Sequence, residues 1–382
     1  MDIYFDNAAT TFPKPQCVVD AVATCTKEWA VNTGRGIYPL AQKAERVVLE
    51  TRQYIAALLN YKQGQVIFSS SATLALNQVL LGLEWTKGNF IYVTPFEHNA
   101  VARSIENLVK TFGIEVVELP VNKHSLEFNL DKIGKAFFKK PPTAIVLNHV
   151  SNVCGLITPV FEIAQLGKRY EAKVIVDGAQ GGPLLPLGEY EKLIDFYVFS
   201  GHKTFYGPFG IAGFITNGQI NLKPILFGGT GSQSELLSMP EELPFKLEIG
   251  SLNIVAISGL NASCQWLTEQ GIEKIVFHER ELMSYAIEGL SQFTQVKTFV
   301  SQNITNHLGI LSFVVEGFTV QEVGMILSQQ YGIAARTGLH CAPLAHKFLG
   351  TFPKGTIRLG FGFFNTKNEV QCFINAIEKI VE

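Results

Sequence analysis

The strongest constraint on the fold is a series of short apolar segments that alternate with longer helix-like stretches between residues 65 and 216. Continuous apolar runs of this kind are typical of strands buried on both faces, and the stretches between them are long enough for crossover helices. The pattern predicts an α/β fold with a mainly parallel, doubly wound sheet. The predicted strands are QVIFSS (65–70), NFIYVTP (89–95), IEVVEL (114–119), TAIVLNHV (143–150), AKVIVD (172–177), FYVFS (196–200) and GIAGFIT (210–216).

Polar residues follow five of these predicted strands directly. In a doubly wound sheet, ligands bind at the carboxyl ends of the strands, where the connecting loops begin. We therefore expect the functional site among residues 71–73, 97–99, 148–152, 177–180 and 200–203.

A chain of 382 residues exceeds the size at which a single core usually stops growing, so we expect two domains. The segment 215–260 is rich in Gly, Ser and Pro and reads as long loops. After it, amphipathic stretches such as 272–290 alternate with strands such as LGILSFVVEG (308–317), and Thr366 with Glu369 forms a capping box. We predict a large domain over 13–258 and a smaller α+β domain formed by 1–12 and 259–382.

The charge and cysteine patterns exclude several classes of function. The chain has 31 basic and 33 acidic residues without long runs of either sign, which gives no electrostatic footprint for nucleic acid or a membrane surface. None of the six cysteines forms a CxxC pair, so neither a metal site nor a disulfide framework is indicated. The amino terminus has no signal-like pattern, and no apolar run is long enough to span a bilayer. We expect a cytoplasmic protein that acts on a small molecule.

Lys203 lies in FSGHKTFYGPFG (199–210), between an apolar run and a Gly/Pro/aromatic turn. A loop lysine is usually solvated, but an amine beside a buried apolar site has a depressed pKa and becomes nucleophilic, as a covalent bond to an aldehyde cofactor requires. Asp177, directly after an apolar strand, is a candidate partner for the protonated ring nitrogen of pyridoxal phosphate (PLP). The alternative for Asp177 is a turn-capping residue before Gly.

Other residues near the predicted strand ends supply further parts of a PLP site. The start of the predicted helix after residue 70, with the Thr73 hydroxyl, is a seat for an anion or an ordinary N-cap. Gln180 could reach a ring hydroxyl, and His98 could stack on a ring or be a structural residue. Ser200 and His202 flank Lys203 and could bind the phosphate. Neither common glycine-rich nucleotide motif is present.

The whole chain resembles the cysteine desulfurases and selenocysteine lyases of the class V aminotransferase group, which are PLP enzymes of fold type I. The resemblance rests on eight segments in the family's order. They are DNAATTFPKP (6–15), FSSSATLALN (68–77), PFEHNAV (95–101), NHVSNVCG (148–155), VDGAQ (176–180), SGHKTFYGP (200–208), ARTGLHCAPLAH (335–346) and TIRLGFGFFNT (356–366). The short R-T-G-x-H-C-A segment is similar to the second desulfurase subgroup.

The resemblance implies a role for each matching position. Lys203 would bond the cofactor aldehyde, Asp177 would pair with the ring nitrogen, and His98 would stack on the ring and take part in proton transfer. Ser251 matches a residue that reaches the phosphate of a neighbouring subunit, which implies a homodimer with shared active sites. The remaining implied contacts are Gln180 and Asn152 near the ring and substrate, and Ala72, Thr73, Ser200 and His202 at the phosphate.

Cys341 matches the nucleophile that takes sulfur from the substrate and carries it as a persulfide. Thiolate attack needs a depressed pKa, and we expect Arg336 and His340 to supply positive potential. Arg358 matches the arginine that grips the substrate carboxylate, and Arg336 is a second candidate there. Where the family usually has a substrate-side His, this chain has Tyr38, so Tyr38 bears on substrate preference.

The resemblance leaves three activities open. The first is desulfuration of L-cysteine to L-alanine, often with a sulfur-acceptor protein. The second is the lyase reaction on L-selenocysteine. The third is an aminotransferase or another lyase of this fold, which would not need Cys341. A non-catalytic scaffold that kept the fold would bind no cofactor and would be insensitive to the loss of Lys203.

Overall fold

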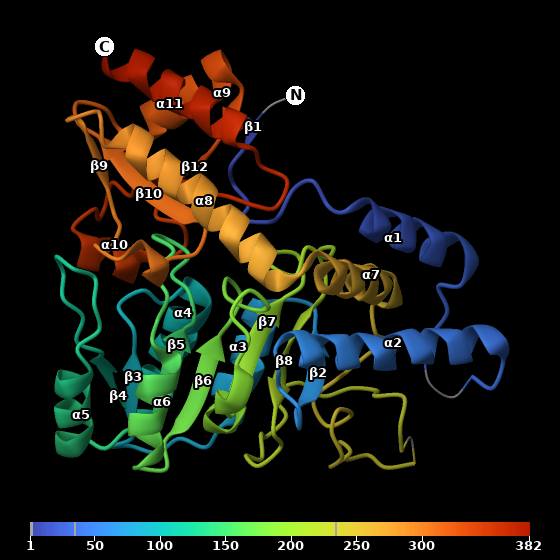
Figure 1. Cartoon of the computed structure of the whole chain (residues 1–382). Coiled ribbons are helices and arrows are strands. Elements are labelled where there is room, and N and C mark those ends of the chain that lie inside the picture. Colours follow the sequence, from blue (N-terminus) through green and yellow to red (C-terminus); the bar gives the residue numbers. More distant parts are fainter. Residues whose placement is uncertain (1–2, 34–35, 234) are drawn as a thin grey trace.

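A seven-stranded sheet forms the centre of the protein, as seen in a computed structural model that describes residues 3–33, 36–233 and 235–382 (Figure 1). Only β8 runs antiparallel to its neighbours, so the sheet is mainly parallel, as predicted. All seven strands expected from the sequence are present. In spatial order they are β2 (Gln65–Ser69), β8 (Ala212–Thr216), β7 (Phe196–Ser200), β6 (Lys173–Asp177), β5 (Ala144–Asn148), β3 (Phe90–Val93) and β4 (Glu115–Glu118).

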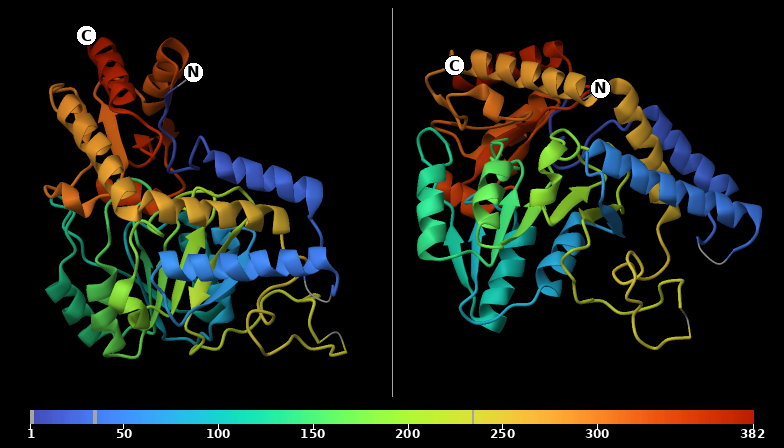
Figure 2. Two further views of the ribbon diagram at one scale, coloured as in Figure 1. Left: turned by 45° about the vertical axis from the view of Figure 1, so that its right-hand side comes forward. Right: turned by 60° about the horizontal axis from the view of Figure 1, so that its bottom comes forward.

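Helices cover both faces of this sheet (Figures 1 and 2). Successive residues of β5 alternate between the two cores: Ile145 and Leu147 pack into one, Ala144 and Val146 into the other. This double burial explains why the strands are apolar throughout rather than alternating with polar residues. The first core contains α2 (Pro39–Leu58), α5 (Leu130–Lys139), α6 (Val160–Lys168) and α7 (Ile254–Gln270), and the second contains α3 (Ala72–Gly82) and α4 (Asn99–Phe112).

A second, antiparallel sheet lies beyond the first, next to the carboxyl-terminal helices (Figure 2). Its strands are β12 (Arg336–Gly338), β13 (Thr356–Gly360), β10 (Ile310–Val315) and β9 (Val296–Thr298). They share a core with α8 (Ile272–Leu290), α9 (Val320–Tyr331) and α11 (Lys367–Val381). The predicted capping box of Thr366 and Glu369 begins α11. The short strand β1 (Ile3–Tyr4) pairs in parallel with β11 (Ile333–Ala334).

Helix α7 crosses the predicted domain limit at residue 258 and packs against α1 (Gln16–Glu28) and α2. The domain limits themselves stay a prediction. Between Thr216 and Ile254 the described residues form neither helix nor strand, which agrees with the expected loops. The expected loop segment ran to residue 260, however, and this last part is wrong, because residues 254–260 form the first turns of α7. No helix within the described part of the chain has both the length and the apolar character needed to cross a membrane.

Candidate active site

A cavity of about 580 Å³, counted with its mouth, opens at the carboxyl ends of the parallel strands. Residues from all five of the predicted strand-end segments line it, which makes this cavity the candidate site. Nine of the residues singled out in the sequence meet there. They are Ala72, Thr73, His98, Asn152, Asp177, Gln180, Ser200, His202 and Lys203.

One end of the cavity lies at the start of α3. The Ser71 side chain caps this helix, because its Oγ accepts a hydrogen bond from the Leu74 N–H at 3.2 Å. The backbone at Ala72 and Thr73 lies in the first turn, where the helix dipole favours an anion. His202 lines the same cavity, and its buried Nδ1 has no hydrogen-bond partner among the described residues. An anion with several acceptor oxygens would satisfy these groups.

Asp177 and Lys203 bring opposite charges into the same cavity. Asp177 ends β6 and accepts a hydrogen bond from the Ala179 N–H at 3.0 Å, so the turn-capping contact is also present. Burial lowers the pKa of Lys203 to about 8, although the carboxylate of Asp177 opposes this shift. An amine with this pKa is deprotonated often enough near neutral pH to act as a nucleophile or base.

His98 caps α4 and lies beside a buried carboxyl group. Its Nδ1 accepts a hydrogen bond from the Ala100 N–H at 3.0 Å, and burial lowers its pKa. The neighbouring Glu97 is only 1% exposed. Its Oε1 accepts hydrogen bonds from Thr94 Oγ1 at 2.6 Å and from the Asn148 N–H at 2.9 Å, while Oε2 has no partner in the described structure. Burial, with the charge of Asp177, raises the pKa of Glu97 to about 8.

The amino-terminal segment binds the chain next to Lys203, which the sequence reasoning missed. The carbonyl of His202 accepts hydrogen bonds from Thr10 Oγ1 at 2.9 Å and from Lys14 Nζ at 2.8 Å. Thr11 Oγ1 donates to the Lys203 carbonyl at 3.1 Å. Burial lowers the pKa of Lys14 to about 7. The motif DNAATTFPKP was visible in the sequence, but nothing in it pointed to residue 202.

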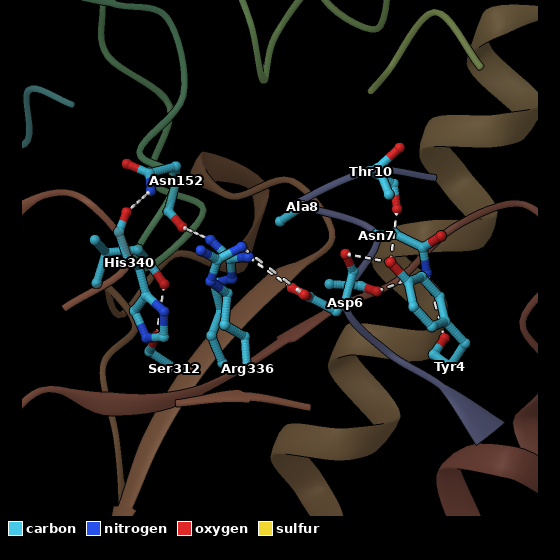
Figure 3. Close-up of polar contacts among 12 residues, drawn as sticks. Tyr4, Asp6, Asn7, Ala8, Thr10, Asn152, Ser312, Arg336 and His340 are labelled. Carbon is cyan, nitrogen blue, oxygen red and sulfur yellow. Dashed lines mark hydrogen bonds and ion pairs between the residues drawn. The ribbon is translucent and has the colours of Figure 1, made fainter. Parts of the chain in front are cut away.

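Arg358 lies on β13 and is 2% exposed. Its Nη2 donates to Asp6 Oδ1 at 2.7 Å, and its Nη1 donates to the backbone carbonyl of Asn152 at 2.9 Å. Arg336, on the adjacent strand β12, is 4.0 Å from the other oxygen of Asp6. Figure 3 shows the guanidinium groups meeting the Asp6 carboxylate beside Asn152. Asp6 is a second residue that the sequence reasoning missed.

Cys341 lies on an exposed turn that is fixed to the cavity wall. His340 and Cys341 have φ angles of 47° and 56°, in the left-handed region. The Cys341 carbonyl accepts a hydrogen bond from the Asn99 N–H at 2.7 Å, and the His340 carbonyl accepts one from Asn152 Nδ2 at 2.7 Å (Figure 3). The turn therefore lies between His98, which precedes Asn99, and Asn152.

The expectation that His340 supplies positive potential to Cys341 is wrong. His340 is buried, and this burial, together with the charges of Arg358 and Arg336, lowers its pKa to about 2. The imidazole is therefore neutral at any working pH. The positive charges that interact with Cys341 are those of Arg358 and Lys203.

Five of the predicted residues lie outside the cavity lining in this chain. Ser251 lines a separate pocket beside Asn253 and Glu248. Tyr38 is the N-cap of α2 and is 49% exposed. Arg336, Arg358 and Cys341 also lie outside the lining itself. Arg358 contacts the lining residue Asn152, and Cys341 contacts Asn99, which stands between the lining residues His98 and Ala100. Six cysteines are free and no cluster of metal ligands occurs within the described ranges.

Comparison with known proteins gives the family. The profile "Aminotransferase class-V" matches residues 3–373. The chain belongs to this family. A probable cysteine desulfurase of Pyrococcus abyssi is 32% identical over 387 residues, an alignment that covers 100% of this chain and 94% of the relative. One from Halalkalibacterium halodurans is 31% identical and is covered to 93%. The chain is thus an enzyme of the class-V group, and its relatives carry the name of cysteine desulfurases.

Solved structures agree with this family. The apo structure of a cysteine desulfurase from Thermococcus onnurineus has a TM-score of 0.92 at 29% identity, and covers 100% of this chain and 94% of its own. A cysteine desulfurase from Escherichia coli, described as an S-sulfonic acid form, has a TM-score of 0.86 at 28% identity, and the match covers 99% of this chain and 94% of that one. The fold is therefore that of the PLP-dependent fold type I enzymes, as expected. The selenocysteine lyase alternative is not favoured by these relatives.

The cavity suits PLP, the cofactor of this enzyme family. The unpartnered Nδ1 of His202 and the start of α3 fit a phosphate, and the buried carboxylate of Asp177 fits a protonated ring nitrogen. The amine of Lys203 lies in the same lining, with the pKa that bonding to an aldehyde requires.

Proposed function

We propose that this chain is a cysteine desulfurase that converts L-cysteine to L-alanine and leaves the sulfur on Cys341 as a persulfide. The observation that carries the proposal is the position of the Cys341 turn. Hydrogen bonds from Asn99 and Asn152 hold it between the cavity of Lys203 and the arginine Arg358. An aminotransferase would have no use for a thiol fixed there.

We propose that PLP is held by the residues that the sequence indicated. Ala72, Thr73, Ser200 and His202 would bind the phosphate, Asp177 the ring nitrogen, and Gln180 and His98 the ring. Bound PLP acts as an electron sink that stabilises negative charge at the Cα atom of an amino acid. Lys203 would hold the cofactor covalently in the resting enzyme.

The protein's own groups divide the remaining work. Arg358 binds the substrate carboxylate with the guanidinium N–H groups that Asp6 and Asn152 leave free, with Arg336 beside it. The Lys203 amine takes the Cα proton, because its lowered pKa lets it accept a proton near neutral pH. Burial also lowers the pKa of His98, so its imidazole is neutral. Its Nδ1 caps α4, which leaves Nε2 to pass a proton.

In the sulfur transfer, the Cys341 thiolate attacks the sulfur of the substrate. A new S–S bond forms as the bond between the substrate sulfur and Cβ breaks, and the electron pair of that bond stays with the substrate carbon. Protonation of that carbon, followed by return of a proton to Cα from Lys203, completes alanine, and the enzyme retains the persulfide. Because Cys341 is exposed, an acceptor protein can reach it.

The test replaces Cys341 by Ser and measures alanine formed from L-cysteine, with L-selenocysteine as a second substrate. We expect C341S to lose alanine formation from cysteine. Cys372→Ser is the matched control, since Cys372 is also exposed but lies on α11. Unchanged alanine formation in C341S would contradict the persulfide mechanism, and a protein that binds no PLP would contradict the whole proposal.

We further propose a cytoplasmic homodimer whose active sites are shared. Ser251 and Tyr38 lie outside the cavity lining of their own chain, as expected of residues that act at the cavity of a second copy. Large apolar side chains are exposed in the same parts of the chain, such as Ile37 at 92% and Phe227 at 74%. Free cysteines fit a reducing compartment. Sedimentation of a monomer at micromolar concentration would refute the dimer.

A further inference from the structure

A continuous chain of hydrogen bonds joins the Cys341 turn to the strand that carries Arg358. We call it the His340 network, and its members are His340, Thr356, Ser312, Val153 and Asn152. His340 Nε2 lies 2.9 Å from Thr356 Oγ1, which lies 3.0 Å from Ser312 Oγ, which lies 2.6 Å from the Val153 carbonyl. Figure 3 shows His340 above Ser312 and next to Asn152.

The direction of every hydrogen bond in the network is fixed. The Val153 carbonyl can only accept, so the single hydroxyl proton of Ser312 is donated to it. Ser312 Oγ must then accept the proton of Thr356, and Thr356 Oγ1 must accept from His340. Since a neutral imidazole has one N–H, His340 carries its proton on Nε2. Its Nδ1 is a bare acceptor, buried and without a partner in the described structure.

The neutral state of this imidazole is also fixed. Burial and the charges of Arg358 and Arg336 lower the pKa of His340 to about 2, and His346, whose ring lies 5.5 Å away, adds to this. A second proton on His340 would lie beside two guanidinium groups in a buried site. His340 therefore works as a permanent hydrogen-bond donor and not as an acid or base.

The backbone of the same residue completes the link. The His340 carbonyl accepts from Asn152 Nδ2, and the Asn152 carbonyl accepts from Arg358 Nη1. Thr356 lies two residues before Arg358 on β13, so both side chains point to the same face of the strand. The turn is held to Asn152 by its backbone and to β13 by its side chain.

The turn needs such an anchor, because its conformation is unfavourable. His340 and Cys341 are non-glycine residues with positive φ, a strained conformation that persists only where the surrounding structure enforces it. Without the anchor, the turn would relax and move the sulfur of Cys341. Because sulfur transfer needs the two reacting atoms in line and close together, a shift of about 1 Å matters.

We propose that His340 is a positioning residue that sets Cys341 relative to Arg358 by donating a hydrogen bond from Nε2 to Thr356. This inference rests on the proposed desulfurase function. It assigns His340 no contact with the substrate. Its role is to hold the Cys341 thiol at a fixed position relative to Arg358, which binds the substrate carboxylate.

The experiment compares Thr356→Val with Thr356→Ser in the PLP-loaded enzyme. Valine has the shape of threonine but cannot accept from His340, while serine keeps the hydroxyl. Thr351→Val is the matched control, because Thr351 Oγ1 also contacts an imidazole, at 2.7 Å from His346 Nδ1, but lies outside the network. His340→Leu removes the side-chain N–H donor, whereas His340→Gln keeps one.

We expect T356V and H340L to lower kcat for alanine formation by about tenfold or more, with KM for cysteine within about threefold, since a loss of 1.4 kcal/mol corresponds to tenfold. T356S and T351V should stay within about threefold of wild type, and H340Q should recover part of the loss. The second readout is the rate at which iodoacetamide alkylates Cys341, followed by peptide mass spectrometry. It should rise about threefold or more in T356V and H340L as the turn is released. Thermal unfolding shows whether each variant is folded.

Equal kcat and alkylation in T356V and T356S would overturn the inference, as would a loss in T351V as large as in T356V. Failure of the proposed function looks different. If the wild-type protein forms no alanine, desulfuration is refuted, whereas the alkylation rates of Cys341 still test the His340 network.

Discussion

Replacing Glu97 by Gln tests most directly the electrostatics of the buried carboxyl group next to His98. Glutamine reproduces the shape of the protonated carboxyl group and keeps the Oε1 acceptor for Thr94 and Asn148. It cannot ionise. The variant therefore isolates the stability that the wild-type protein loses with rising pH, because Glu97 ionises readily in the unfolded chain but not beside Asp177 in the folded protein.

The magnitude follows from the pKa of Glu97, about 8 in the folded protein against 4.5 for the free side chain. Because the pKa of Glu97 is higher in the folded protein than in the unfolded chain, the contribution of Glu97 to the unfolding free energy is complete below pH 4.5 and is lost as the pH rises through 8. Between pH 5 and pH 8 this loss is about 3.5 kcal/mol. E97Q does not undergo this loss, so the difference in unfolding free energy between E97Q and wild type should grow by about 3.5 kcal/mol from pH 5 to pH 8.

Urea unfolding at pH 5, 6.5 and 8 measures this difference. Other titrating groups, including His98, are shared by the two proteins and largely cancel. Glu378→Gln, an exposed position on α11, is the control and should show a nearly constant difference from wild type. A difference between E97Q and wild type that does not change with pH would refute the reasoning, because Glu97 would then ionise at an ordinary pH.

Three further substitutions test other parts of the structure. Asp6→Asn removes the counterion of Arg358. Because Asp6 is partly exposed, we expect the free energy of unfolding in urea to fall by about 2 kcal/mol and the KM for cysteine to rise. An unchanged KM would show that Asp6 does not orient Arg358. Thr366→Ala removes the capping box of α11 and should cost about 1 kcal/mol, and no change in the unfolding midpoint would contradict it. Gly155→Ala should cost more than about 2 kcal/mol, because Gly155 has φ 72° and an added Cβ would lie 2.5 Å from the Ile310 carbonyl oxygen. Gly134→Ala, in the open helix α5, should instead be neutral or stabilising.

The central sheet was predictable because its strands are buried on both faces. Each appears in the sequence as a continuous apolar run, and the polar residues after the runs mark the edge where the cavity lies. Helix α8 coincides with the amphipathic stretch 272–290 for a similar reason, since one of its faces is buried. The two residues of β1 and the three of β12 were too short to give any period.

The contacts that complete the site were not predictable in this way. Asp6 meets Arg358 across 352 positions of the chain, and Lys14 meets the His202 carbonyl across 188. Periodicity carries no information on such pairs. Burial at single positions is equally hidden, which is why His340 was expected to be cationic and Glu97 received no role, although both are buried.

The pairing of β1 with β11 has a consequence for the order in which the protein is made. A ribosome that has finished Ile3 must add roughly 330 more residues before Ile333, its partner, exists. At about 5–20 residues per second this takes roughly 20–60 s. The central sheet can form in that interval, but Arg358 has not yet been made to meet Asp6. An incomplete chain can therefore have the cavity at the strand ends before it has Arg358. The site is complete only once the strand that carries Arg358 has been made.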